Sequence, residues 1–405
     1  MEEKRNVPNL RFPGFTDSWE QRRLGEIGSV AMCKRVYKNQ TTEAGDVPFF
    51  KIGTFGGEPD AFISNELFEK YRELYSFPKV GDILISAAGT IGRTIVYQGE
   101  RAYYQDSNIV WLNHDERLDN SFFLQYLNNQ TWSSLEGSTL KRLYNKDILD
   151  ANIALPKPDE QHRIGALFRK LDSLIALHQR KLDHVKELKK GLLQKMFPKE
   201  GANVPELRFP GFTDPWEQRR LGECGTTYGG LSGKTKEDFG HGEARFVPYT
   251  NIFENPIADT GRLESIEIDP KQNQVRFGDA FFTVSSETPE DVGMSSVWLS
   301  DQPNVYLNSF CFGYRQDGSF DSDYLAYMLR SQGVRYDIVL LAQGISRFNI
   351  SKNKVMELDV PFPEKGEQEL IGTFFRKLDS LIALHQRELD HVKELKKGLL
   401  QQMFV

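Results

Sequence analysis

The residues of this chain that could carry chemistry fit no catalytic motif. The sequence lacks a Gly-x-x-x-x-Gly-Lys-Ser/Thr phosphate loop, a His-Glu-x-x-His zinc motif and a Cys-x-x-Cys pair. It also lacks the Asn/Asp-Pro-Pro-aromatic motif of adenine methyltransferases. Glu187 and Lys189 have the spacing of a nuclease pair, but they lie in a helical segment without a Pro-Asp partner on a preceding strand. A solvated helix face explains them better, so we expect no catalytic residue.

Histidine and cysteine, which often bind transition metals, are scattered along the chain. The three cysteines (Cys33, Cys224 and Cys311) lie far apart. Their odd number predicts free thiols in the cytoplasm, and neither a disulfide framework nor a thiolate metal site. Histidines recur at matching positions of two helical segments, His178 with His385 and His184 with His391. We interpret them as packing or interface residues and expect no metal site.

An internal repeat organises the chain. Residues 7–26 return as residues 204–223 with 18 of 20 positions identical. Residues 168–197 return as residues 375–404 with 28 of 30 positions identical. These repeated blocks form a frame around two other segments.

The two inserts, residues 27–150 and 224–360, share only scattered landmarks. The frame sequence is nearly the same in both halves of the chain, whereas the two inserts differ. This contrast indicates that the frame and the inserts have different roles. Joining Val405 to Met1 would close a ring of two equivalent halves. This order predicts a pseudo-twofold arrangement with the termini close together.

The second repeated block predicts two long helices. Apolar residues recur every three or four positions between Ile164 and Met196. With Asp159 as a candidate N-cap, this helix would be about 58 Å long, and its twin would run from about Glu367 to Phe404. Neither apolar stripe can be buried alone, so we expect the helices to pack as an antiparallel coiled coil. The alternative is that each helix packs only on its own insert.

Each insert has the pattern of a mixed α/β module. Short β-type runs occur at residues 47–52, 82–86 and 107–112, and helical patterns at residues 121–127 and 324–329. Gly-rich turns lie between them. The expected fold class is α/β (α+β), with two mixed modules separated by the two long antiparallel helices.

The whole chain resembles the specificity subunit of type I restriction–modification systems. The resemblance rests on Leu-Arg-Phe-Pro-Gly-Phe at residues 10–15 with Trp19, repeated before the second module, and on the paired helices. It also rests on the helix entry Leu-Pro-Lys-Pro-Asp-Glu-Gln at residues 155–161. The second copy departs from this entry at residues 360–368, where a longer spacer leaves the start of that helix open. Residues 81–92 also look like the recognition module of the family.

The resemblance implies four parts: target-recognition domains at residues 1–155 and 200–362, and spacer helices at residues 156–199 and 363–405. Each recognition domain would read one half of a bipartite, asymmetric site in double-stranded DNA. The spacer helices would set the gap between the half-sites. The chain itself would be non-catalytic.

The resemblance also implies partners that carry the chemistry. Two methylation subunits would dock on the helices, and restriction/translocase subunits would join them. We expect no cofactor in this chain, because S-adenosylmethionine, ATP and Mg²⁺ would belong to the partner subunits. The helix positions expected to form the helix–helix and partner surfaces are Leu171, Leu174, Ile175, His178, Leu182, Val185, Leu378, Leu381, Ile382, His385, Leu389 and Val392.

Side chains for DNA contact are expected among basic and small polar residues on turns, because these contact phosphates and base edges. The candidates of the first module are Lys34, Arg35, Lys38, Thr90, Arg93, Lys141 and Arg142. The candidates of the second module are Lys234, Lys236, Tyr249, Asn251, Arg347 and Asn349.

The net charge of −6 disfavours a simple nucleic-acid binder. Residues 27–150 hold 13 Lys and Arg against 16 Asp and Glu, and residues 224–360 hold 12 against 19. The basic residues must therefore cluster in space if the modules read DNA. No apolar run approaches the roughly 20 residues of a membrane span, so no membrane partner is expected. A two-module adaptor that binds proteins is the alternative function.

Overall fold

The chain divides into two units, each of which combines segments far apart in the sequence. This computed structural model describes residues 6–132, 142–199 and 201–405. Unit 1 comprises Met1–His178 and Glu388–Val405, and unit 2 comprises Gln179–Arg387. The long helices α4 (Pro158–Met196) and α9 (Lys365–Met403) each contribute to both units. Each unit therefore holds one module, the first half of the helix that follows it and the second half of the other helix.

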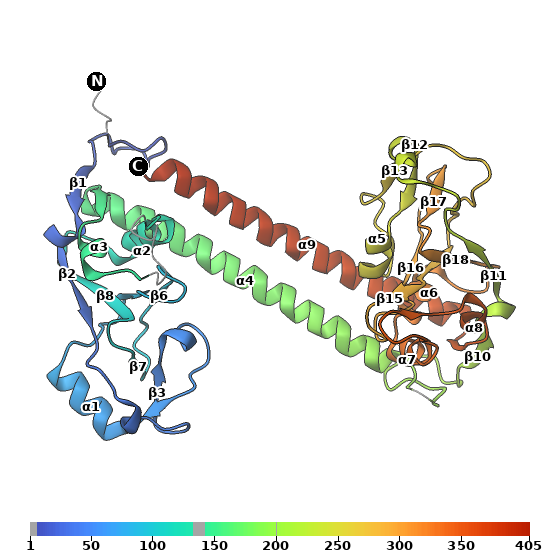
Figure 1. The fold of residues 1–405 in the computed structure, drawn as a ribbon, viewed down its shortest axis with the longest axis horizontal. Helices are drawn as coiled ribbons and strands as arrows, with labels where there is room; N and C mark the ends of the chain where they lie inside the picture. Colours follow the sequence, from blue (N-terminus) through green and yellow to red (C-terminus); the bar gives the residue numbers. More distant parts are fainter. Residues whose placement is uncertain (1–5, 133–141, 200) are drawn as a thin grey trace. The chain divides into compact units, whose positions relative to one another are not determined.

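Unit 1 is built on a four-stranded antiparallel sheet in the order β2-β8-β5-β6. A three-stranded mixed sheet, β4-β3-β7, and the two-stranded β1-β9 ribbon complete it (Figure 1). The strand bounds are β1 Glu20–Arg23, β2 Gly28–Met32, β3 Val47–Phe50, β4 Phe62–Ile63, β5 Ile83–Ser86, β6 Thr94–Val96, β7 Tyr103–Tyr104, β8 Ile109–His114 and β9 Asn152–Leu155. Its shorter helices are α1 Asn65–Leu74, α2 Asn120–Asn129 and α3 Asn145–Leu149.

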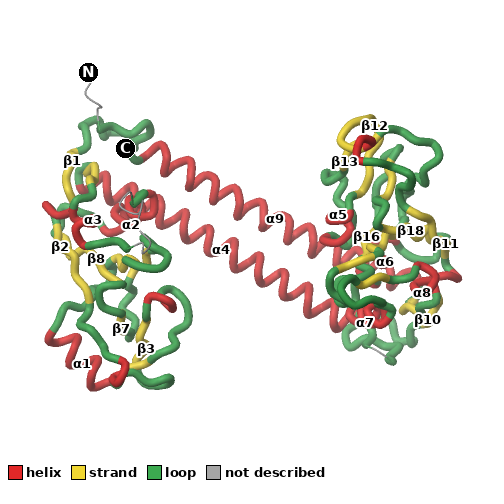
Figure 2. The backbone as a smooth tube through the Cα atoms, in the orientation of Figure 1, coloured by secondary structure: helices red, strands yellow, loops and turns green. Residues whose placement is uncertain are grey.

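Unit 2 repeats this plan, with sheets β11-β18-β14-β16 and β13-β12-β17 and the ribbon β10-β20. It adds one further ribbon, β15-β19, and Figure 2 shows how much of the unit lies in loops between short strands. The strand bounds are β10 Glu217–Arg220, β11 Gly225–Gly229, β12 Phe239–Val247, β13 Glu264–Ile266, β14 Ala280–Thr283, β15 Ser285–Ser286, β16 Ser295–Val297, β17 Val305–Leu307, β18 Cys311–Gln316, β19 Phe348–Asn349 and β20 Asp359–Phe362. Its shorter helices are α5 Tyr249–Glu254, α6 Ser322–Met328, α7 Gln332–Leu340 and α8 Lys352–Met356.

Local sequence explains the central elements of each module. All four residues of β5 and of β14 are buried, as expected for the continuous apolar runs of central strands. Asp119 caps α2 by accepting hydrogen bonds from the backbone N–H groups of Ser121 and Phe122. Asp321 caps α6 in the same way. The predicted β runs and helical segments of the inserts are therefore present.

The end of α9 completes the core of unit 1. Phe404 packs on Trp19, Phe122 and Phe168, with ring centroids 5.2–6.3 Å apart. The Leu10 N–H donates to the carbonyl oxygen of Gln402 at 2.9 Å, so the C-terminal end of the chain lies beside the N-terminal frame block (Figure 1). The first frame block therefore lies beside the end of α9 within unit 1, in line with the arrangement that the repeat order predicts.

The end of α4 has the matching place in unit 2. Phe197 packs on Trp216, Tyr324 and Phe375 at 5.7–6.2 Å. The Leu207 N–H donates to the carbonyl oxygen of Lys195 at 2.9 Å. The two units thus share one construction, as the repeat predicts.

The two long helices pack antiparallel inside each unit. In unit 1, Lys396 of α9 forms an ion pair of 2.6 Å with Asp172 of α4. In unit 2, Lys189 of α4 forms the equivalent ion pair with Asp379 of α9. Each helix also packs on module residues, so the helices bury their apolar stripes both against each other and against the modules.

One detail of the helix start differs from the sequence prediction. α4 begins at Pro158, because proline is well suited to the first helical position, and the N–H of Glu160 donates to the carbonyl oxygen of Lys157. Asp159 therefore lies inside the first turn, where its charge favours the helix dipole, and the prediction that it is the N-cap is wrong. Among the described residues, no helix is both long and apolar enough to cross a bilayer.

Candidate nucleic-acid interface

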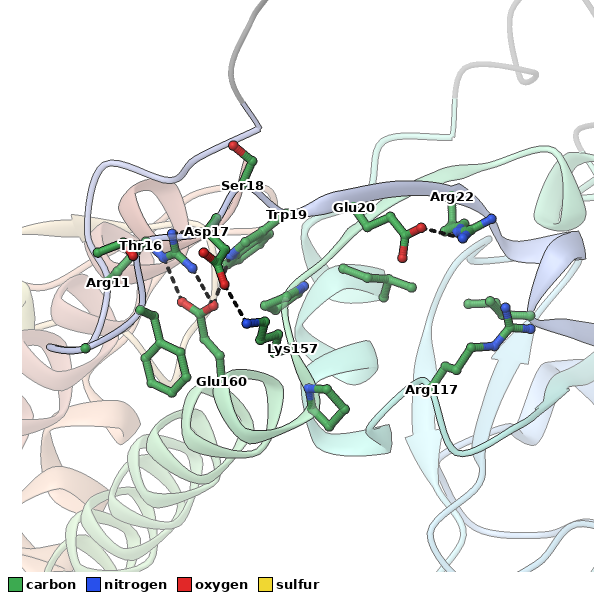
Figure 3. Close-up of a pocket in the computed structure, with 16 residues that line it drawn as sticks. Arg11, Thr16, Asp17, Ser18, Trp19, Glu20, Arg22, Arg117, Lys157 and Glu160 are labelled. Atoms are coloured by element: carbon green, nitrogen blue, oxygen red, sulfur yellow. Dashed lines mark hydrogen bonds and ion pairs between the residues drawn. The ribbon is translucent and has the colours of Figure 1, made fainter.

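A buried carboxylate joins the first frame block to the start of α4 (Figure 3). Glu160 is only 1% exposed and accepts two hydrogen bonds from Arg11, at 2.8 and 2.7 Å, and a third from Trp19 Nε1 at 3.2 Å. The hydrogen bond to Glu160 raises the pKa of Arg11. Figure 3 also shows Lys157 reaching Asp17, with an Nζ–Oδ2 distance of 2.5 Å. These contacts fix the module on its helix.

The second frame block repeats this anchor with its own residues. Glu367 accepts from Arg208 at 2.9 and 2.7 Å and from Trp216 Nε1 at 2.8 Å. The hollows beside the two anchors measure 460 Å³ and 340 Å³. A charged pair with this geometry needs both partners, because a buried charge without its partner is costly. The anchor therefore gives a physical reason for the near identity of the two frame blocks.

The basic candidates of the first module meet at one end of its four-stranded sheet. At this end, which we call the rim, β2 and β5 finish and β6 and β8 begin. Lys34 and Arg35 follow β2, and the loop after β5 carries Thr90 and Arg93. Arg142 joins them, because its Nη2 donates to the carbonyl oxygen of Ser107, just before β8, at 2.8 Å.

Neighbouring groups hold the side chains of the first rim. Arg35 Nε donates to Asp106 Oδ2 at 2.7 Å, and this hydrogen bond raises the pKa of Arg35. Arg93 Nη2 donates to the carbonyl oxygen of Gly56 at 3.0 Å. The Lys34 ammonium lies 4.9 Å from the ring centre of Tyr75. The first rim is therefore basic and partly pre-ordered, which suits contact with phosphates.

Two other candidates of the first module stand apart from this group. Lys38 begins a separate 3-10 turn, Lys38–Gln40, whose Gln40 donates to the Tyr71 hydroxyl at 3.3 Å. Lys141 lies outside the described residues.

The rim of the second module has the same backbone framework with different side chains. The Ile350 N–H donates to the carbonyl oxygen of Val284, as the Leu143 N–H donates to that of Ala87. This register places Asn349 in the second module where Arg142 stands in the first. Tyr249, Arg347 and Asn349 of the predicted set line one hollow of 680 Å³ at this rim.

The remaining candidates of the second module lie in other surroundings. Lys234 pairs with Asp269 at 2.8 Å, which lowers the pKa of that carboxyl to about 2, and Lys236 begins the adjacent 3-10 turn. Asn251 is fully buried in α5, and its amide donates to the carbonyl oxygens of Asp259 and Arg262. The side chain of Asn251 is therefore buried, and its amide group is hydrogen-bonded inside the protein.

Two arginines that the sequence analysis missed hold the second rim in place. Arg330 donates to the carbonyl oxygens of Ser295, Ile252, Phe253 and Asn255, and burial lowers its pKa to about 10. Arg335 donates to the carbonyl oxygens of Glu290, Val292 and Gly293. Arg335 lies in the short helix α7, and Arg330 lies just before it. No motif or spacing in the sequence marks either arginine, because their partners are backbone groups distant in sequence.

The predicted helix positions divide into buried and exposed sets. Leu171, Leu182, Val185, Leu378 and Leu389 are buried in the helix–helix and helix–module cores. Ile175, His178, Ile382, His385 and Val392 are half-buried, and in unit 1 the Nδ1 of His178 lies 3.1 Å from Glu388 Oε2. Leu174 and Leu381 remain exposed.

Six leucines at repeat-related positions of the two long helices, Leu174 and Leu381 among them, are exposed. In unit 1 they are Leu174, Leu177 and Leu395, and in unit 2 they are Leu381, Leu384 and Leu188, each between 37% and 46% exposed. Each long helix therefore carries the same three exposed leucines, in addition to those in the buried core.

Comparison with known proteins decides the family. The model of the type I restriction modification DNA specificity domain matches residues 16–187 and again residues 213–394. The chain belongs to this specificity family. Its two matched segments each contain part of one frame block, one module and most of one long helix, so the chain has the architecture of a specificity subunit with two DNA specificity domains.

Similar proteins agree with this assignment. A Haemophilus influenzae protein provisionally named as a type I restriction enzyme specificity subunit is 53% identical over 152 residues, which are 37% of this chain and 40% of that relative. The type I restriction enzyme MjaVIII specificity subunit of Methanocaldococcus jannaschii is 21% identical over 81% of this chain and 76% of its own length. The solved S subunit of a type I system from M. genitalium shares the fold, with a TM-score of 0.63 and 15% identity over 98% of this chain and 99% of that one.

Each of the two rims belongs to one of the two specificity domains. Each specificity domain has one rim with the same backbone register, while the frame around it is repeated almost without change.

Proposed function

We propose that this chain directs a type I restriction–modification complex to a bipartite, asymmetric sequence in double-stranded DNA. One half-site is read at the rim of the first module and the other at the rim of the second. The observation that carries the proposal is the pairing of one backbone framework with two different sets of side chains. Arg142 of one rim and Asn349 of the other occupy the same register, and arginine and asparagine prefer guanine and adenine edges respectively.

The proposed contact set follows from the rim geometry. In the first module it comprises Lys34, Arg35, Thr90, Arg93 and Arg142, with Lys38 nearby in sequence. In the second module it comprises Tyr249, Arg347 and Asn349 at the rim, with Lys234 and Lys236 as further basic residues. Two unlike rims in one chain predict two unlike half-sites.

The test is a methylome map of cells that carry the chain and its methylation partner, compared with cells that lack only this chain. We expect one interrupted, asymmetric adenine motif to vanish when the chain is removed. Identical maps, in cells where the complex assembles, would contradict the proposal and favour an adaptor that binds proteins. Insertion of one helical turn between Leu182 and Leu192 should change the gap of the motif and leave both half-sites unchanged.

We further propose that the exposed leucines of each unit dock one methylation subunit. Two equivalent surfaces in one chain suit two copies of the same partner, and exposed apolar patches on helices are typical of interaction sites. In this scheme the chain is non-catalytic and acts in the cytoplasm, where its three free, buried cysteines stay reduced. S-adenosylmethionine, ATP and Mg²⁺ are then bound by the methylation and restriction/translocase subunits.

Native mass spectrometry of purified complexes tests the docking surface. Leu174→Ser with Leu177→Ser should remove one of two methylation subunits, and Leu381→Ser with Leu384→Ser should remove the other. Lys170→Ser, which changes an exposed polar residue on the same helix, is the matched control. Two bound partners in both double variants would contradict the assignment of this surface.

A further inference from the structure

The hollow at the second rim differs from an ordinary groove-reading surface because it is concave. It measures 680 Å³, within the range of small-ligand sites, and lies among the loop after β14, helix α5 and strand β19. Base edges in a stacked duplex are read by side chains that project into a groove. A hollow instead receives a group that projects from the DNA.

The walls of this hollow are aromatic. The rings of Tyr249 and Phe253 stack with centroids 6.0 Å apart and an interplanar angle of 17°. The Tyr249 hydroxyl donates to the carbonyl oxygen of Ser285 at 2.8 Å, which fixes the ring. Phe310 also lines the hollow and is 66% exposed, although a side chain of this kind is usually buried. Exposed aromatic faces of this kind are the platforms on which unstacked bases stack.

The polar groups of the hollow suit a base and disfavour a phosphate. Arg347 and Asn349 offer donors, and Asn349 also offers an acceptor. Glu287 and Asp291 line the same hollow with carboxylates, which repel a phosphate but accept hydrogen bonds from exocyclic amino groups. The Ser285 hydroxyl is buried beside them and has no hydrogen-bond partner in the described part of the chain. Donors and acceptors around aromatic walls match the edge and the faces of a nucleobase.

The two arginines Arg330 and Arg335 hold the walls of the hollow in a fixed shape. Arg330 binds the carbonyl oxygens of Ile252 and Phe253 in α5, and so holds the aromatic wall. Arg335 binds three carbonyl oxygens of residues 290–293, and so holds the loop that carries the carboxylates. A site formed before its ligand arrives loses less entropy on binding.

We propose that this hollow binds one nucleobase of the second half-site after that base has left the helical stack. The inference rests on the proposed function and adds a mode of reading: the second domain holds an unstacked base between Tyr249 and Phe310, with Asn349 and a carboxylate at its edge. Taking a base out of the stack costs free energy, and the cost is least where the base is already unpaired.

The sign of a mismatch effect tests the proposal. The full chain, in complex with its methylation subunit, is titrated with duplexes that carry a mismatch at each position of the second half-site in turn. At one position we expect tighter binding, by about 10-fold or more, when the base that enters the hollow is kept and its pairing partner is changed to a mismatch. The base is then already unpaired, so less free energy is needed to take it out of the stack. A duplex with an abasic nucleotide at the same position should bind more weakly than the mismatched duplex, because no base then fills the hollow.

Variants locate the effect in this hollow. Phe310→Ala and Asn349→Ala should abolish the tightening, while Phe277→Ala, which removes another exposed aromatic ring outside the hollow, should keep it. Weaker binding with a mismatch at every position overturns the proposal and leaves the proposed function intact. Tightening that persists in Phe310→Ala also overturns it, because the base is then held by another site. Absence of sequence-specific binding by the unaltered complex overturns the proposed function itself.

Discussion

The two rims contrast within one framework. The first presents Arg35, Arg93 and Arg142 around a short Gly-containing loop, whereas the second presents aromatic rings, carboxylates and Asn349 around a hollow held by buried arginines. Both have the same backbone hydrogen bond at the end of the central strand, from Leu143 to Ala87 in the first and from Ile350 to Val284 in the second. The difference teaches that the backbone fixes where contacts are made, while the side chains and the loop length decide what is contacted and how.

The largest expected effect falls on the frame, where the units should respond alike. Glu160→Gln in unit 1 and Glu367→Gln in unit 2 each leave a mostly buried arginine without its countercharge, so each should destabilise its unit by about 3–5 kcal/mol. Urea unfolding of the full chain measures this. Asp359→Asn, which breaks an exposed ion pair with Arg220, is the control and should cost under about 1 kcal/mol. Unequal losses in the two units would break the equivalence of the frames.

The next effect should separate the modules. Arg335→Gln removes charge-assisted hydrogen bonds to three backbone carbonyl groups of the second rim, so it should cost about 2–3 kcal/mol in unit 2. The variant complex should then methylate DNA sites with an altered second half-site more readily than the unaltered complex does. Discrimination against changes in the first half-site should stay the same. Arg376→Gln, at an exposed ion pair in the same unit, should change neither. Relaxed reading of the first half-site would argue against independent rims.

A matched pair of substitutions sharpens the comparison at one register position. Arg142→Ala should reduce discrimination at one base pair of the first half-site, and Asn349→Ala at one base pair of the second, each by about 1–3 kcal/mol. Competition binding with single base-pair variants of the site measures both. An equal loss at all positions in either variant would indicate a phosphate contact instead of a base contact.

The smallest expected effect concerns the charge of the first rim. Lys34→Ala removes one exposed cation, so the slope of log affinity against log salt concentration should fall by about 1. Binding should weaken to a similar degree on every sequence that the complex recognises. Lys236→Ala supplies the comparison in the second module, and a change in sequence preference for Lys34→Ala would contradict its role as a positioning residue.

The repeat and the periodicity of the long helices predicted the architecture well, because both depend on local pattern. The frame anchor shows why: Arg11 and Trp19 recur with the same spacing as Arg208 and Trp216, and each pair binds the glutamate near the start of the long helix that follows. The rims were harder to predict. Asn251 looked like a turn residue after Pro248, but tertiary contacts buried it, and the carbonyl partners of Arg330 could not be read from a linear sequence. Phe310 was also missed, since its exposure depends on a loop whose shape is set by distant strands.

The packing of Phe404 and Met403 into the core of unit 1 has a consequence for synthesis on the ribosome. The first module leaves the ribosome early, yet its core lacks these side chains until the last residues are made. At roughly 5–20 residues per second, the stretch from His178 to Phe404 takes about 10–45 s to translate. The second unit, whose residues are contiguous in sequence, ends at Arg387 and is therefore fully translated shortly before Phe404. The module that is translated first is thus the last to gain a complete core.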